Sequence, residues 1–183
     1  MTAPAGPRPA IEPVAEASVD ELVAFFDRLP EGDRTFFKEP VHGAETVRRW
    51  LAEPVPGRFV ARLDGQVVGY VALLPGVGWS NHVVELRLVV DPERRGEGLG
   101  RRLATDALQA ALDDGYRKVM VEVVAAQEST IALFQSLGFT PEALLEDHVR
   151  DANGDLADLI LLSHHVGANW ETLAALGMEA PLD

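Results

Sequence analysis

Apolar and polar positions in the first third of the chain predict one edge strand and two helices. Ile11–Ala17 is a candidate strand, and Pro13 favours an edge position because proline cannot donate a hydrogen bond to a neighbouring strand. Ser18, followed three residues later by Glu21, has the form of a capping box at a helix start. Ala44–Ala52 is predicted to be a second helix. The apolar face of the first helix consists of Val19, Leu22, Val23, Phe26 and Leu29.

Short turn sequences predict two β-hairpins. Asp64-Gly65 and Asn153-Gly154 each lie between two apolar runs, and dipeptides of this kind favour two-residue hairpin turns. The expected strand pairs are Arg58–Leu63 with Gln66–Leu74, and Leu144–Arg150 with Leu156–Val166.

The segment between the hairpins predicts two further strands, each followed by a helix. The apolar run Val83–Val90 is typical of a buried strand and is ended by Asp91-Pro92. Glycines then occupy every second position from 96 to 100, and Leu99–Leu112 has an apolar half at helical spacing. Arg117–Ala125 is predicted to be another buried strand, and Gln127–Leu137 is predicted to be the helix that follows it.

The predicted order is β-α-α-β-β-β-α-β-α-β-β, which indicates an α/β fold with a mixed sheet. Hairpins place strands antiparallel, whereas a strand–helix–strand unit places them parallel. A length of 183 residues suits one domain, which we expect over residues 11–166. Residues 1–10 are rich in proline and alanine and lack the apolar segment of a signal peptide, and we expect them to be a disordered tail. Residues 167–183 are expected to hold a C-terminal helix, Trp170–Leu176, and a tail.

The composition of the chain limits the classes of partner and ligand that it is expected to bind. The net charge of −13 argues against nucleic acid and anionic membranes, and no run of about 18 apolar residues predicts a membrane span. Without cysteines the chain has no disulfides or thiolate zinc sites, which fits a reducing cytoplasm. We expect no metal site, because the adjacent His164 and His165 point to opposite faces of a strand. Asp151–Asp155 is better interpreted as a turn than as a calcium loop, since it lacks the closing glutamate.

The glycine-rich turn is the strongest candidate for a binding site. A helix start offers unpaired backbone N–H groups and a positive dipole end, and glycines let a ligand approach the backbone closely. A phosphate or pyrophosphate is the natural ligand. The alternative is a plain strand-to-helix turn with solvated arginines. The turn is neither a Walker A loop nor a dinucleotide fingerprint. In this acidic chain it is flanked by Arg94, Arg95, Arg101 and Arg102.

Two motifs resemble the GNAT (Gcn5-related N-acetyltransferase) superfamily. Arg95-x-x-Gly98-x-Gly100, after Val90-Asp91-Pro92, is similar to that family's acyl-CoA loop, Arg/Gln-x-x-Gly-x-Gly/Ala. The segment from Gln127 to Phe139 is similar to Asn-x-x-Ala-Ile-x-Leu-Tyr-x-x-Leu-Gly-Phe. With the order of elements, the resemblance covers roughly residues 11 to 165. It implies the GNAT fold and an N-acetyltransferase that moves an acetyl group from acetyl-CoA, its co-substrate, to a primary amine by direct attack in a ternary complex.

The resemblance also implies roles for individual residues. The backbone of Leu88, Val89 and Val90 would pair with the pantetheine arm and place an N–H near the thioester carbonyl. Arg94 or Arg102 would meet the 3′-phosphate. Gln127 stands where the family usually has a pantetheine-binding asparagine, and Phe134 where it usually has a tyrosine that serves as general acid. The loop that would bind the pyrophosphate comprises Arg95, Gly96, Glu97, Gly98, Leu99, Gly100 and Arg101.

Glu85 is the first candidate for the general base, directly or through a water molecule. The alternative is a strand residue paired with Arg87 on the same face. Glu122, in the middle of a strand, either faces the substrate cleft or pairs with an arginine, since an unpaired buried carboxylate is costly. His148 and Asp158 lie on the last hairpin, which borders the acceptor site in this family.

Other functions stay open at this point. Because Phe134 has no proton to give, a catalytically weak acyl-CoA-binding sensor or partner domain is the alternative to an enzyme. A third interpretation is an α/β domain that binds another phosphorylated ligand at Gly96–Gly100. Dimers are frequent in the family, which leaves a homodimer as an expectation. The acceptor amine depends on loops whose conformation the sequence does not predict.

Overall fold

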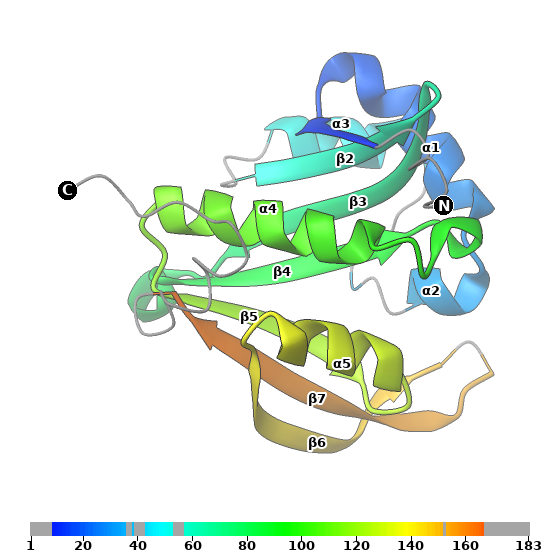
Figure 1. The fold of residues 1–183 in the computed structure, drawn as a ribbon. Coiled ribbons are helices and arrows are strands. Elements are labelled where there is room, and N and C mark those ends of the chain that lie inside the picture. The colour runs from blue at the N-terminus through cyan, green and yellow to red at the C-terminus, as the bar shows by residue number, and fades with distance from the viewer. Residues whose placement is uncertain (1–8, 36–37, 39–42, 53–56, 152, 167–183) are drawn as a thin grey trace, which may run out of the picture.

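The computed structural model describes residues 9–35, 38, 43–52, 57–151 and 153–166 (Figure 1). Its centre is a seven-stranded mixed sheet with the strand order β1-β2-β3-β4-β5-β7-β6. The strands are β1 (Ala10–Pro13), β2 (Gly57–Leu63), β3 (Gln66–Pro75), β4 (Val83–Val90), β5 (Lys118–Val124), β6 (Thr140–Arg150) and β7 (Leu156–His165). The helices are α1 (Val19–Arg28), α2 (Glu31–Thr35), α3 (Gly43–Ala52), α4 (Leu99–Asp113) and α5 (Glu128–Ser136).

The sheet is mixed in the way that the predicted connections require. Both hairpins, β2–β3 and β6–β7, are antiparallel, and β4 and β5, which α4 connects, are parallel. The α/β fold class is therefore confirmed. The helix predicted over Trp170–Leu176 and most of the tail predicted over residues 1–10 lie outside the described residues.

Helices cover both faces of the sheet, because the alternation of side chains sends apolar groups to each side. On one face α4 and α5 pack on the sheet, with buried residues such as Leu103, Leu108 and Phe134 (Figure 1). On the other face α1 and α3 pack on β2, β3 and β4, and the rings of Phe26, Trp50 and Tyr70 contact one another there. The sheet is therefore a rigid platform between two apolar clusters.

The capping box predicted at Ser18 and Glu21 is wrong. In the described part of the chain no side-chain hydrogen bond caps α1. The Ser18 hydroxyl oxygen instead accepts from the backbone N–H of Ala15 at 3.4 Å and from Arg62 at 3.2 Å, and Glu21 forms an ion pair with Arg62. The guanidinium of Arg62 on β2 thus takes both groups that a local cap would have used.

Two boundaries and one short helix also differ from the prediction. β1 ends at Pro13, and residues 16–18 form a 3-10 turn instead of continuing the strand to Ala17. Glu31–Thr35 forms the short helix α2, in a part of the chain for which the sequence pattern predicts no element. β6 begins at Thr140, four residues before Leu144, and its pairing with β7 is interrupted by bulges that obscure the alternating pattern.

Candidate active site

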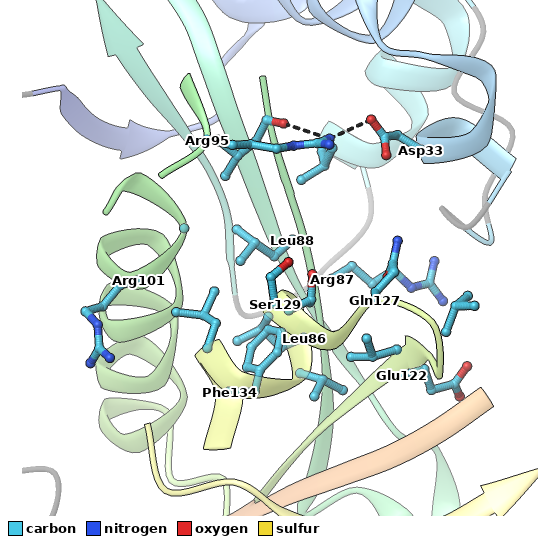
Figure 2. A pocket seen from close by; sticks show the side chains of 18 of the residues that line it. Asp33, Leu86, Arg87, Leu88, Arg95, Arg101, Glu122, Gln127, Ser129 and Phe134 are labelled. Carbon is cyan, nitrogen blue, oxygen red and sulfur yellow. Dashed lines mark hydrogen bonds and ion pairs between the residues drawn. The ribbon is translucent and has the colours of Figure 1, made fainter. Parts of the chain in front are cut away.

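A split between β4 and β5 creates a pocket in the described structure. The register of this parallel pair runs from Val83 to Glu85, which faces Met120. Beyond that point β4 stays paired with β3 as far as Val90, and β5 stays paired with β7 as far as Val124. The facing edges of β4 and β5 therefore open into a pocket of about 880 Å³, which both strands line (Figure 2).

The start of α4 closes one end of this pocket. Gly96 and Gly98 have φ angles of +82° and +80°, a region that side chains strongly disfavour, so the turn depends on glycine here. α4 has no acidic residue in its first turn, and within the described residues no side chain caps it at Gly98. Gly98, Leu99, Gly100 and Arg101 line the pocket. The unpaired N–H groups and the positive end of a 15-residue helix thus face a cavity, as an anion site requires.

The flanking arginines differ in direction. Arg95 reaches across the pocket entrance, where it donates to Asp33 of α2 at 2.6 Å and to the Val90 carbonyl at 3.5 Å (Figure 2). Arg94 also lines the pocket. Arg101 donates instead to the Ser136 hydroxyl of α5, and its guanidinium lies away from the other labelled side chains (Figure 2).

α5 forms the opposite wall of the pocket. Gln127 lies just before its first turn, and Phe134 lies on its inner face (Figure 2). The Phe134 side chain is 3% exposed and packs edge-to-face on Phe139, with 5.1 Å between the ring centroids. Phe134 therefore contributes to the pocket wall and to the core at once.

A cluster of four charged side chains lies where the strands diverge. Arg87 donates two hydrogen bonds to Glu85, at 2.9 and 3.2 Å. The Lys38 ammonium lies 3.1 Å from Glu85 Oε1 and also pairs with Glu122 Oε2 on β5. Burial alone would raise the pKa of Glu85, but the Arg87 hydrogen bonds and the charges of Arg87 and Lys38 outweigh it and lower that pKa. Glu85 is therefore held as a carboxylate.

The described residues contain neither a membrane-spanning helix nor a cluster of potential metal ligands. None of their helices combines the length and apolar character needed to cross a bilayer. None of their histidines and carboxylates gather in groups of three or more that could hold a metal ion.

Comparison with known proteins places the chain in a family. The model of the "Acetyltransferase (GNAT) family" matches residues 22–139, which include the split strands, the glycine turn and α5. The chain belongs to the GNAT acetyltransferase family. Several curated relatives that it matches are named N-acetyltransferases. One is N-acetyltransferase 8 of Rattus norvegicus, which is 32% identical over 99 residues, or 52% of this chain and 45% of the relative. The chain thus spans about half the length of the curated relatives it matches.

Solved structures show the same GNAT fold. A ribosomal-protein-alanine N-acetyltransferase from Brucella melitensis superimposes with a TM-score of 0.75 at 24% identity, covering 85% of this chain and 99% of that one. The protein yncA, a putative acetyltransferase from Salmonella typhimurium whose structure contains acetyl-CoA, has a TM-score of 0.76 at 19% identity, with 87% and 95% covered. At these identities the likeness establishes the fold.

The GNAT pocket brings together most of the residues singled out in the sequence. Two of these residues, Glu97 and Arg102, are not among the described residues that line it. The Glu97 carboxylate lies 3.8 Å from the Arg94 guanidinium, and Arg102 donates to the Pro9 carbonyl at 2.9 Å. The residues of the predicted set that do line it are Glu85, Leu88, Val89, Val90, Arg95, Gly96, Gly98, Leu99, Gly100, Arg101, Gln127 and Phe134.

The two interpretations of Glu85 turn out to be compatible, since it lines the pocket and pairs with Arg87. Glu122 lines the pocket too, which fits the first of its two alternatives, and its ion-pair partner is Lys38 rather than an arginine. His148 lines the pocket, whereas Asp158 accepts a hydrogen bond from the Asp147 backbone N–H at 2.9 Å and is missing from the described lining.

Sequence reasoning missed Asp33 and Lys38, both of which line the pocket. Lys38 is more than 45 positions from Glu85 and more than 80 from Glu122 along the chain. It falls in a segment with no clear helical or strand periodicity, so no local signal points to it. Asp33 lies in the unpredicted helix α2.

Proposed function

We propose that this chain transfers an acetyl group from acetyl-CoA to a primary amine by direct attack in a ternary complex. The observation that carries the proposal is the split between β4 and β5, which ends at an uncapped helix start in a member of the GNAT family. The Salmonella neighbour, whose structure contains acetyl-CoA, supports the choice of acyl donor. The lack of cysteines suits a reducing compartment, and we place the reaction in the cytoplasm.

The glycine turn is the proposed pyrophosphate site. The backbone N–H groups at the start of α4 would donate to the phosphate oxygens, with Arg94 and Arg95 supplying positive charge at the entrance. The Arg101 side chain is directed to Ser136, so its proposed contribution is its backbone N–H. The pantetheine arm would run along the exposed edge of Leu88–Val90, as an added strand does at a free sheet edge.

Glu85 is the proposed general base. Attack requires a neutral amine, so an incoming ammonium must give up a proton to a carboxylate or to water. A Glu85 held in its charged form by Arg87 and Lys38 attracts the ammonium and accepts this proton directly or through a water molecule. The pocket position of Glu85 beside the divergence of the strands supports this role.

The reaction does not depend on a tyrosine at position 134. As the amine attacks, a backbone N–H on the open edge of β4 would stabilise the oxyanion. The sulfur then leaves as a thiolate, whose pKa of about 8–9 makes protonation less demanding than for an alkoxide. Phe134 would act as an apolar wall beside the thioester, since it lines the pocket and is 3% exposed.

Isothermal titration with CoA and with acetyl-CoA tests the binding step. We expect both to bind the wild type, and Gly98→Glu to weaken binding by at least about tenfold, or 1.4 kcal/mol. The new side chain would strain a backbone with φ near +80° and put a carboxylate beside the phosphates. Failure of the wild type to bind either compound would overturn the proposal.

Turnover with a panel of amines tests the chemical step. Release of CoA that depends on an added amine supports the enzyme. Tight binding without turnover on any amine would favour the second candidate, an acyl-CoA-binding sensor. Phe134 is the observation that favours this candidate, because it gives the site no general acid at that position.

A further inference from the structure

The Lys38 ammonium occupies the place where an acceptor amine would be expected. It lies 3.1 Å from Glu85, the proposed base on β4, and pairs with Glu122 on β5, so it bridges the two strands at their divergence. The side chain is 40% exposed, and Lys38 lines the same pocket as the glycine turn. A primary amine of the chain itself is therefore held between two pocket carboxylates.

The position of Lys38 relative to the proposed acyl donor follows from the strand register. The arm would run along β4 from the glycine turn toward the point where β4 and β5 meet, at Glu85 and Met120. Its thioester end therefore comes nearest to the residues at that junction. Because Lys38 already contacts the side chain of Glu85, its nitrogen lies at the acyl end of the pocket rather than at the phosphate end.

The second lysine of the chain provides a comparison within the same molecule. The chain has two lysines, Lys38 and Lys118. Lys118 also pairs with a carboxylate, since its ammonium lies 2.7 Å from both oxygens of Glu142, and its side chain is 22% exposed. Lys118 is missing from the described lining of the pocket. The two lysines are thus alike in having acidic partners and differ in their access to a bound acyl donor.

We propose that Lys38 is an intramolecular acceptor, which receives an acetyl group on Nζ from the acetyl-CoA bound in the same molecule. This inference rests on the proposed acetyl-CoA site and extends the proposed function to a modification site on the enzyme. In this inference Glu85 and Glu122 form a binding site for an ammonium group. Lys38 occupies that site until another amine displaces it.

The proposed step balances without any further reactant. The Lys38 ammonium gives a proton to Glu85, Glu122 or a nearby water molecule, and the neutral nitrogen attacks the thioester carbonyl carbon. A carbon–nitrogen bond forms and the carbon–sulfur bond breaks, with its electron pair leaving on sulfur. The thiolate takes up a proton, so the products are Nε-acetyl-lysine and CoA, and nothing is oxidised or reduced.

Acetylation would change the site for later substrates. The acetylated side chain has no positive charge, so the ion pairs with Glu85 and Glu122 are lost and the net charge of the cluster falls by one. A cationic acceptor amine would then meet two carboxylates that no longer hold an internal ammonium.

Peptide mass spectrometry of the purified full chain, incubated with acetyl-CoA, tests the inference. We expect acetylation at Lys38 to proceed at least about tenfold faster than at Lys118, because bringing reactants together in one complex strongly favours their reaction. The rate constant should be independent of protein concentration, as an intramolecular transfer requires. Lys118→Arg should leave the rate at Lys38 unchanged, and Gly98→Glu should reduce it to the rate of Lys118.

Three outcomes would overturn the inference. They are equal rates at the two lysines, an undiminished rate at Lys38 in Gly98→Glu, or a rate constant that rises with protein concentration. Titration with CoA and turnover on added amines, measured on the same preparation, distinguish a failure of the Lys38 inference from a failure of the proposed function. If the wild type binds acetyl-CoA and acetylates added amines while Lys38 stays unmodified, the inference alone fails. If it does not bind acetyl-CoA, the proposed function fails with it.

Discussion

At the residue scale, Glu85 shows how one side chain serves both structure and chemistry. Its bidentate pairing with Arg87 fixes the orientation of the carboxylate, and the same pairing lowers its pKa in spite of partial burial. A carboxylate with a low pKa is a weak base but a strong electrostatic partner for an ammonium. We therefore expect Glu85 to contribute both by attracting the acceptor and by taking its proton.

Replacing Glu85 by glutamine should lower kcat by about 100-fold, the lower end of the usual contribution of a general base. Affinity for CoA should stay the same, since Glu85 lies at the acyl end of the pocket. Steady-state kinetics and titration with CoA measure the two effects. Glu142→Gln is the matched control, because Glu142 is also an ion-paired glutamate and is not among the described residues that line the pocket. Equal activity of the wild type and the Glu85 variant would contradict the role.

The pH dependence of turnover follows from the direction of the Glu85 pKa shift. The folded-state pKa lies below the ordinary glutamate value of about 4.3, so Glu85 is fully deprotonated at neutral pH. Between about pH 6 and 9 the rate should rise with pH because the acceptor ammonium loses its proton, and the Glu85→Gln profile should run parallel to the wild type. An activity loss below about pH 6 that disappears in Glu85→Gln would contradict this assignment.

At the scale of elements, long amphipathic helices and the glycine turn were predictable, whereas short or bulged elements were not. α4 buries residues on the apolar half that its periodicity indicates, because one apolar face must leave water. α2 has five residues, too few for a periodic signal, and its Asp33 meets Arg95 from another part of the chain. A partner far away in the sequence also replaces the capping box predicted at Ser18, because the Ser18 hydroxyl accepts a hydrogen bond from Arg62, 44 positions away.

The two glycines at the ends of α4 allow a matched test of the anion site. Gly98 precedes the helix with φ +80°, Gly115 follows it with φ +78°, and an added Cβ would meet no atom within 4 Å at either position. Alanine should therefore cost each variant a similar stability, about 1–2 kcal/mol for left-handed backbone. CoA affinity should fall in Gly98→Ala alone, as measured by titration. An equal loss of affinity in both variants would indicate a global effect rather than a local anion site.

At the scale of the whole molecule, the pocket depends on both halves of the sheet. One wall comes from β4 and the start of α4, and the other from β5 and α5 (Figure 2). A ligand that bridges them binds the folded chain and not the unfolded one. Acetyl-CoA at 100 times its Kd should therefore raise the free energy of unfolding by about 2.7 kcal/mol. Urea denaturation with and without ligand measures the shift, and an equal shift in Gly98→Glu would contradict the site.

His164 should make the stability of the whole fold depend on pH. It is fully buried in β7 against Phe139, with ring centroids 5.3 Å apart. Burial first, and then the charge of His165, lower the pKa of His164. The unfolded chain, with a histidine pKa of about 6.5, therefore binds the proton more readily than the folded one. The free energy of unfolding should fall as pH drops below about 6.5, by up to about 1.4 kcal/mol per pH unit, until the folded-state pKa is reached.

Urea denaturation at a series of pH values measures this slope. His164→Phe, which keeps a buried ring but cannot be protonated, should flatten the slope between about pH 6.5 and 5. His82→Gln is the control, because His82 is exposed. An unchanged slope in His164→Phe would show that another group carries the pH dependence.

The sequence by itself determined the strands and long helices, the mixed sheet and the glycine turn, because periodicity, turn dipeptides and glycine spacing are local properties of the chain. It also carried the motifs that resemble the GNAT family, and the match of the family model to residues 22–139 confirms the family. Only the tertiary structure decided where β4 and β5 part, that Arg101 faces Ser136, and that Lys38 lies between Glu85 and Glu122. These features depend on strand register and on ion pairs between residues far apart in the sequence, which local patterns do not encode.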